Sequence, residues 1–271
     1  MQGASREALG QSWRTVERVL AGASADDAAH LGDELLGVVA VLDDQVGLRR
    51  ALSDPAIDAD RKAALVDAVL GSRISSSALE VIRGAVRSRW SRMRDLGDAI
   101  EQLGVLARLI GADRAGQSDE VEDELFRLAR IVESGTNLRE ALASSNLPVR
   151  NKTDLLHALL DGKVTPTTLA LAVQLITHPR GRKPEQGLAE YGEIAARRTR
   201  RSVARVITVA PLTDTERARL RAALARLYGR DVALQIEIDP GVVGGLVVEV
   251  GDEIIDGSIA GRLADARQRL K

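Results

Sequence analysis

The residues of this chain that could perform acid–base chemistry or hold a metal ion are its histidines and carboxylates, because the sequence contains no cysteine. The absence of cysteine excludes disulfides, zinc–thiolate sites and thiolate nucleophiles. His30, His157 and His178 lie far apart, and none has another ligand at the spacing of a metal motif. We therefore interpret the histidines as solvated or core-edge residues and predict no metal site.

Neighbouring carboxylates occur at Asp26-Asp27 and Asp43-Asp44. Neighbouring acids in a helical pattern usually form a solvated face rather than a catalytic pair. The nucleotide-binding patterns G-x-x-x-x-G-K-[ST] and G-x-G-x-x-G are both absent. The glycine cluster at 241–245 precedes a strand pattern rather than a helix N-terminus, which is the wrong order for a phosphate cradle. The sequence thus predicts no catalytic, cofactor-binding or metal-binding residues, and a protein that is not an enzyme.

The composition favours a helical core. Of the 271 residues, 45% are hydrophobic but only 2% are aromatic, so a core must be built from Leu, Val, Ile and Ala. Such residues favour helix-on-helix packing over an aromatic-rich sandwich or barrel. Arginine outnumbers lysine 33 to 5, yet the formal net charge is −1. The chain as a whole is therefore not a polycation built to bind nucleic acid.

Charge is distributed unevenly along the chain. Residues 17–60 carry ten acids and three bases, whereas residues 178–205 carry eight bases and three acids. The basic run 196–201 lacks the interleaved aromatic residues that stack on nucleic-acid bases. We therefore predict no nucleic-acid partner. Opposite charged regions of this kind suit docking between proteins, where they fix orientation.

Nothing in the sequence predicts a membrane span. The longest strongly apolar run, residues 35–42, has eight residues, against the roughly 20 that a spanning helix needs. The first ten residues lack the apolar stretch of a signal peptide. We expect a soluble chain in the cytoplasm.

An internal repeat organises the first 200 residues. At an offset of 90, residues 33–79 align without gaps on residues 123–169 with 12 identities in 47 positions, where chance gives roughly 3 to 4. The string Leu-Arg-x-Ala-Leu occurs at 48–52 and again at 138–142, followed in each copy by a single lysine, Lys62 or Lys152. These matches predict a duplicated helical unit.

Each copy has the pattern of a small helical bundle. Apolar residues at spacings of three and four predict helices over 31–42, 61–70 and 75–90, with Trp90 in the last of these, and over the matching segments of the second copy. A helix over 96–110 lies between the copies. Its pattern matches the N-terminal helix 5–20 at the same offset, so it is predicted to close the first bundle and open the second.

The sequence changes character after residue 201. Strand patterns occupy 203–209, 232–238, 246–250 and 253–255, and the last two are joined by Gly251-Asp252, a hairpin signal. A helix starting at the capping box 213–216 separates the first two strands, and a final helix is predicted from about Ser258. We predict a mainly α fold with two tandem duplicated helical bundles, residues 1–94 and 95–201, followed by a small α/β domain, residues 202–271.

The last 30 residues carry a specific resemblance. Residues 243–263 read Gly-Gly, an apolar strand, Gly-Asp, an apolar pair, Asp-Gly-Ser and a closing Leu-rich helix. This pattern resembles the C-terminal signature of the delta subunit of F-type ATP synthases, the oligomycin-sensitivity-conferring protein family. Upstream, 209–213 and the Ser-Asp-Pro at 53–55 followed by Lys62 are similar to the family's patterns. The motif residues that the resemblance assigns to structure or to contact with the b subunit are Gly244, Gly245, Gly251, Asp256, Gly257 and Ser258.

The resemblance implies a non-catalytic peripheral-stalk subunit, or stator, of a proton-translocating ATP synthase. It implies that the helical domain binds the N-terminal helices of alpha subunits and that the C-terminal domain binds the membrane-anchored b subunit. The protein would then lie at the cytoplasmic side of the inner membrane as a peripheral component that resists rotor torque, with no cofactor. At the Asp-Gly-Ser turn a structural role is favoured, in which Gly257 permits a tight turn and Ser258 caps the last helix.

The duplication departs from the ordinary family pattern of one helical domain and resembles the enlarged actinobacterial type. It leaves open which copy binds the alpha subunits, with a preference for the first because that copy carries the N-terminal helix. Two other readings remain at this stage. One is a helical protein–protein adaptor unrelated to ATP synthase, and the other is a small acid–base enzyme whose carboxylates would have to converge in a cleft.

Overall fold

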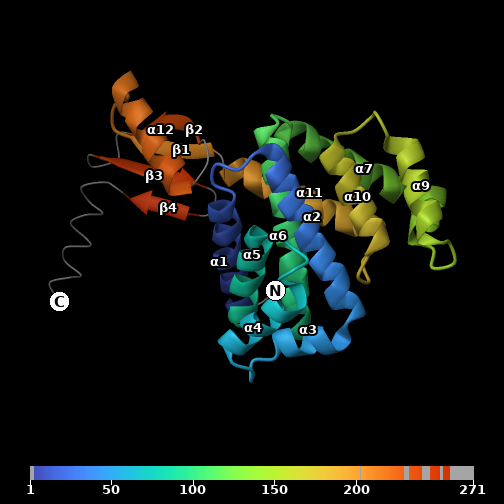
Figure 1. Cartoon of the computed structure of the whole chain (residues 1–271). Coiled ribbons are helices and arrows are strands. Elements are labelled where there is room, and N and C mark those ends of the chain that lie inside the picture. Colours follow the sequence, from blue (N-terminus) through green and yellow to red (C-terminus); the bar gives the residue numbers. More distant parts are fainter. Residues whose placement is uncertain (1–2, 202, 229–231, 240–244, 251–252, 257–271) are drawn as a thin grey trace. The chain divides into compact units, whose positions relative to one another are not determined.

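The computed structural model describes residues 3–201, 203–228, 232–239, 245–250 and 253–256 (Figure 1). The chain separates into two compact units, Met1–Ala195 and Ala196–Lys271. The predicted class, mainly helical with a small C-terminal α/β domain, is confirmed. Both predicted helical bundles fall within the first unit. The boundary between them, predicted at residues 94 and 95, therefore stays a prediction.

The helices predicted before residue 202 are present in the predicted order, and two short helices that were not predicted, α3 (Val46–Ser53) and α8 (Thr136–Ala143), stand among them. The others are α1 (Gly3–Val19), α2 (Ala25–Asp44), α4 (Ala59–Leu70), α5 (Ser76–Arg87), α6 (Met93–Arg114), α7 (Ser118–Ser134), α9 (Val149–Leu160), α10 (Pro166–Thr177) and α11 (Pro184–Arg201). The helix predicted over 75–90 is too long. α5 ends at Arg87, and Trp90 is buried beyond it, where its indole Nε1 donates a hydrogen bond of 2.8 Å to the carbonyl of Ala85.

The helix boundaries repeat at the offset found in the sequence. α8, α9 and α10 each begin and end 90 residues after α3, α4 and α5. A tertiary contact repeats as well. The backbone N–H and hydroxyl of Ser75 both donate to the carboxylate of Glu34, at 2.6 Å each. In the second copy Thr165 donates to Glu124 from the same two groups, at 3.0 and 2.7 Å.

The helix between the copies, α6, packs within both sets of helices. It contacts α1, α2, α3 and α5 on one side of the sequence and α7 and α10 on the other. Its side chains are buried along most of its length, including the polar Asp95 and Glu101. The buried Ser5 hydroxyl of α1 donates a hydrogen bond of 2.7 Å to Asp95. We call α6 the shared helix, because it holds the last position in one bundle and the first in the next.

Glycines bring α2 and the shared helix unusually close together, and Figure 1 shows the two ribbons side by side. A methyl group added to Gly32 would lie 2.9 Å from the carbonyl oxygen of Gly104, and one added to Gly104 would lie 2.8 Å from the side chain of Leu36. A methyl group on Gly111 would lie 2.8 Å from the carbonyl of Ala25. These positions therefore leave no room for a larger side chain.

The second unit is a four-stranded sheet with one helix packed on it. The strands are β1 (Val203–Thr208), β2 (Ala233–Ile238), β3 (Leu246–Val250) and β4 (Glu253–Asp256), and α12 spans Asp214–Tyr228. The order across the sheet is β2-β1-β3-β4, with β1 and β2 parallel and the other pairs antiparallel. The predicted antiparallel pairing of the last two strands is confirmed, although Gly251 and Asp252 themselves lie outside the described residues.

The core of this unit lies between the sheet and α12. The side chains of Ala204, Val206 and Val248 are buried from the sheet, and Leu224 is buried from the helix. The capping box predicted at the start of α12 is present, since Thr213 accepts from the N–H of Glu216 and donates its own N–H to the Glu216 carboxylate.

Two glycines of α2 provide a matched test of the close packing between α2 and the shared helix. Gly32→Ala should lower the free energy of unfolding by about 1–2 kcal/mol, because the added methyl group must push α2 away from the shared helix. Gly37 is exposed on the same helix with nothing within 4 Å of an added methyl group. Gly37→Ala should therefore raise the free energy of unfolding by about 0.5–1 kcal/mol through helix propensity. Urea unfolding measures both, and equal effects of the two variants would contradict the packing described.

Candidate functional site

The three histidines occupy separate positions on the surface or its edge. His157 lies 3.0 Å from Asp161 and His30 lies 3.7 Å from Glu34, each pair within one helix. His178 contacts the hydroxyl of its neighbour Thr177. Among the described residues, no group of three or more histidines and carboxylates is arranged to hold a metal ion.

In each pair of neighbouring carboxylates, one member has a structural partner elsewhere. Asp27 forms a capping box with Ser24 at the start of α2. The hydrogen bonds from the Ser24 side chain and backbone lower the pKa of Asp27 below its usual value. Asp43, near the end of α2, pairs with Arg49 at 3.7 Å and with Arg180 at 2.9 Å.

The motif residues of the C-terminal signature are only partly described. Gly244, Gly251, Gly257 and Ser258 lie outside the described residues. Gly245 has φ of 80°, in the left-handed region that favours glycine. Asp256 ends β4, where its backbone pairs with Val247 of β3. The roles assigned to this signature stay predictions.

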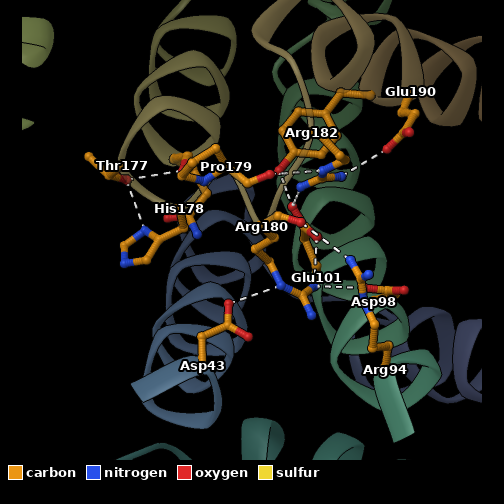
Figure 2. Close-up of polar contacts among 12 residues, drawn as sticks. Asp43, Arg94, Asp98, Glu101, Thr177, His178, Pro179, Arg180, Arg182 and Glu190 are labelled. Atoms are coloured by element: carbon orange, nitrogen blue, oxygen red, sulfur yellow. Dashed lines mark hydrogen bonds and ion pairs between the residues drawn. The ribbon is translucent and has the colours of Figure 1, made fainter. Parts of the chain in front are cut away.

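The main polar cluster of the helical unit is an ionic network that the sequence did not predict. Figure 2 shows Arg180, in the loop between α10 and α11, reaching between α2 and the shared helix. Its guanidinium pairs with Asp43 of α2 at 2.9 Å and with Asp98 and Glu101 of the shared helix at 3.1 and 2.9 Å. The side chain of Arg180 is only 9% exposed. A loop of the second copy is thereby joined to a helix of the first.

Glu101 is the centre of this network. Its buried carboxylate accepts from both Arg180 and Arg182, and the hydroxyl of Tyr191 donates to it at 2.6 Å. Arg182 also pairs with Glu190 at 2.8 Å. Burial alone would lower the pKa of Arg182, but the charge of Glu101 and the hydrogen bonds to Glu101 and Glu190 raise it overall. Burial, together with the negative charge of Glu101, raises the pKa of Tyr191.

The backbone is adapted to let Arg180 enter. Arg180 has φ of 51°, the only positive value among described residues other than glycine, and Gly181 follows at 78°. Such a conformation costs a non-glycine residue of the order of 1 kcal/mol and persists only where other contacts impose it. Gly97 on the shared helix provides the space, since a methyl group there would lie 2.7 Å from the Arg180 guanidinium.

This arrangement is suited to holding helices together rather than to catalysis. Glu101 is occupied by two arginines and a tyrosine, so it is not free to act as a base. From the sequence, the basic residues around 180 were assigned to a charged surface. No residue close to them in the sequence indicates that they pair with acids of α2 and the shared helix. Glu101 lies on the side of the predicted helix 96–110 opposite its apolar stripe, which in an ordinary amphipathic helix faces solvent, so its burial had no local signal.

The surface of the protein was the remaining place for a membrane or protein contact. Among the described helices, none combines the length and the apolar character that crossing a membrane requires. Exposed large apolar side chains occur on both units, and the most exposed are Phe126, Ile131, Leu227 and Ile254. Single exposed apolar side chains are normal on protein surfaces, so none of these residues marks an interface by itself.

Removing the central arginine should destabilise the helical unit. Arg180→Gln leaves three carboxylates with one fewer cation, and we expect the free energy of unfolding to fall by about 3 kcal/mol. Arg94→Gln is the control, because Arg94 is exposed and touches the network only through a hydrogen bond of 3.4 Å to the carbonyl of Arg180 and through the effect of its charge on Asp98. Equal stability of the wild-type protein and Arg180→Gln in urea unfolding would show that the network does not hold the loop.

Asp98 provides a test that depends on pH. Burial raises the pKa of Asp98, and the charge of Arg180 offsets only part of this effect. A carboxyl group whose pKa is higher in the folded state loses stability as the pH rises through that value. Asp98→Asn should therefore be more stable than the wild-type protein at pH 7, and the difference should shrink as the pH falls towards about 4.

The control for this test is Asp154→Asn, at an exposed carboxylate on α9, which should show no such gain in stability. If Asp98→Asn were less stable than the wild-type protein at pH 7, burial would not be the dominant effect on the Asp98 carboxyl group.

Comparison with known proteins identifies the family. The family model described as ATP synthase delta (OSCP) subunit matches residues 105–270. The ATP synthase subunit delta of Acidothermus cellulolyticus is 53% identical over 100% of this chain and 99% of its own length. Those of Streptomyces avermitilis and Streptomyces coelicolor are 49% and 47% identical, over 99% and 100% of this chain and 98% of each relative. The chain belongs to the ATP synthase delta (OSCP) subunit family.

Proposed function

We propose that this protein is the stator subunit that connects the catalytic alpha/beta head of a proton-translocating ATP synthase to the membrane-anchored b subunit. The observation that carries the proposal is the alignment of ATP synthase delta subunits with this chain along its full length, both helical copies included. The subunit itself carries out no catalysis. It lies at the cytoplasmic side of the membrane through its partners and needs no cofactor.

A stator subunit must transmit torque without bending, and the helical unit has the features for this. Two bundles that share one helix have no linker between them at which they could hinge. The network around Glu101 ties the α10–α11 loop to α2 and to the shared helix through buried ion pairs. Buried and hydrogen-bonded charges hold one geometry because each alternative leaves a charge without a partner.

The first copy is the better candidate for binding the N-terminal helices of alpha subunits. α1 has an exposed side that includes Arg6, Glu7 and Arg14. Its counterpart in the second copy is the shared helix, whose surface is covered by helices of both bundles. An amphipathic helix can add to a bundle only where a helix face is open. The exposure of α1 thus supports the assignment of alpha-subunit binding to the first copy.

The C-terminal unit is the candidate for binding the b subunit. The face of its sheet opposite α12 carries Ile254, which is 66% exposed. On the same face Arg205 lies between Glu237 and Glu249, at 2.6 and 3.3 Å. An apolar residue beside a mixed charged row suits the side of a long amphipathic helix. These features support a b-subunit contact on this face.

The absence of cysteine makes site-specific cross-linking a direct test. With a photoactivatable group on one introduced cysteine, Glu7→Cys on α1 should cross-link to an alpha subunit within the purified ATP synthase. Ile254→Cys on β4 should cross-link to the b subunit, and Asp154→Cys, on α9, should give little of either product. Mass spectrometry of the products identifies the partners.

Two results would overturn the proposal. If the tagged protein co-purified with other partners and without the alpha, beta and b subunits, it would be an adaptor outside the ATP synthase. If it were in the complex but the two cross-links were exchanged, the direction of the connection would be wrong.

A further inference from the structure

An exposed aromatic residue marks one face of α7 in the second helical copy. Phe126 is the only phenylalanine in the chain and is 59% exposed. The guanidinium of Arg130, one turn further on, lies 5.8 Å from the centre of its ring. Single exposed apolar side chains are common, so the significance of Phe126 depends on comparison with the equivalent position in the first copy.

The equivalent position in the first helical copy can be compared with Phe126. The residue 90 positions before Phe126 is Leu36 of α2, which is only 4% exposed. Leu36 is buried because α2 lies against the shared helix, close to Gly104. The same face of the repeated helix is therefore covered in the first copy and open in the second.

The sequence explains why this face of α7 stays open. Gly32 and Gly104, which allow α2 and the shared helix to approach, correspond to Glu122 and Ile194 in the second copy. Side chains of this size prevent the same close approach. α11, the counterpart of the shared helix, instead lies next to Leu125, where a methyl group added to Gly192 would be 3.9 Å from the Leu125 side chain.

Charge indicates what fits this face. α7 contains six acidic and two basic residues, for a net charge of −4. Apart from Ala129, which is buried, the positions one or two turns from Phe126 on its own side of the helix are mostly acidic; they are Asp119, Glu122, Asp123, Arg130 and Glu133. All are exposed except Glu122, which is half-buried. We call Phe126 and these five residues the α7 face.

We propose that the α7 face binds a basic amphipathic helix of a partner protein, with an apolar residue of that helix packed on Phe126. The acidic residues attract and orient the basic side chains of the partner. The aromatic ring supplies the apolar anchor, and Arg130, which now lies over the ring, shows that its face accepts a guanidinium. The second copy thereby gains an interaction surface that the first copy does not have. This inference does not depend on the stator proposal.

Binding of a defined peptide to the full-length protein tests the proposal. The probe is a fluorescent synthetic helix of 18 residues with leucines on one side and lysines and arginines on the other, titrated by fluorescence anisotropy. The control peptide keeps the leucines and replaces every basic residue by glutamate. We expect the basic peptide to bind and the acidic peptide not to bind.

Variants of α7 locate the site. Phe126→Ser should weaken binding of the basic peptide by about tenfold, and Glu122→Lys combined with Glu133→Lys should weaken it at least as much. Ile131→Ser is the matched control, because Ile131 is 56% exposed on the same helix but five residues on, on another side. Its affinity should equal that of the wild-type protein. Thermal unfolding of Phe126→Ser should be unchanged, since the side chain is exposed.

Three results would overturn the inference. They are equal affinity of Phe126→Ser and the wild-type protein, equal affinity for the acidic peptide, and a self-associated dimer in sedimentation that Phe126→Ser abolishes. The last result would show that a second copy of this chain covers the α7 face. Because no ATP synthase subunit takes part, failure here leaves the cross-linking test of the stator role unaffected.

Discussion

A helix that belongs to two bundles at once must be buried on nearly every side, and this constraint governs the helical unit. The shared helix meets it in two ways. Towards α2 it presents glycines, so that the backbones approach directly. Towards the α10–α11 loop it presents the carboxylate of Glu101, which would be unstable in the interior without the two arginines and the tyrosine that bind it.

The two copies of the repeat are consequently not equivalent. The first copy has its own N-terminal helix with an open side and a closely packed α2. In the second copy the corresponding N-terminal position is taken by the shared helix, and the glycine that would let α7 pack closely has become Glu122. The duplicated helices therefore form one compact unit with two different surfaces, one on α1 and the other on α7.

Much of the fold could be predicted from the sequence because its signals are local or periodic. The offset of 90 residues, the helix predicted over 61–70, and the capping box at Thr213 and Glu216 all depend on nearby residues. The end of α5 was misplaced because Trp90 continues the apolar spacing although the helix stops at Arg87. The network around Glu101 could not be predicted, since its ion pairs join residues as far as 137 positions apart, from Asp43 to Arg180. The contrast between buried Leu36 and exposed Phe126 was also hidden, because both lie off the predicted apolar stripe of their helix and only contact with the shared helix covers Leu36.

If the shared helix belongs to both bundles, the two bundles must unfold as one cooperative unit. Hydrogen exchange of the full-length protein, followed by mass spectrometry at increasing urea below the unfolding transition, tests it most directly. The account predicts that the slowest-exchanging amides of α5 and α10 open with the same free energy and the same dependence on urea, because unfolding either bundle exposes the shared helix. Independent opening of α7 to α10, at a lower free energy and with α1 to α6 still protected, would contradict it.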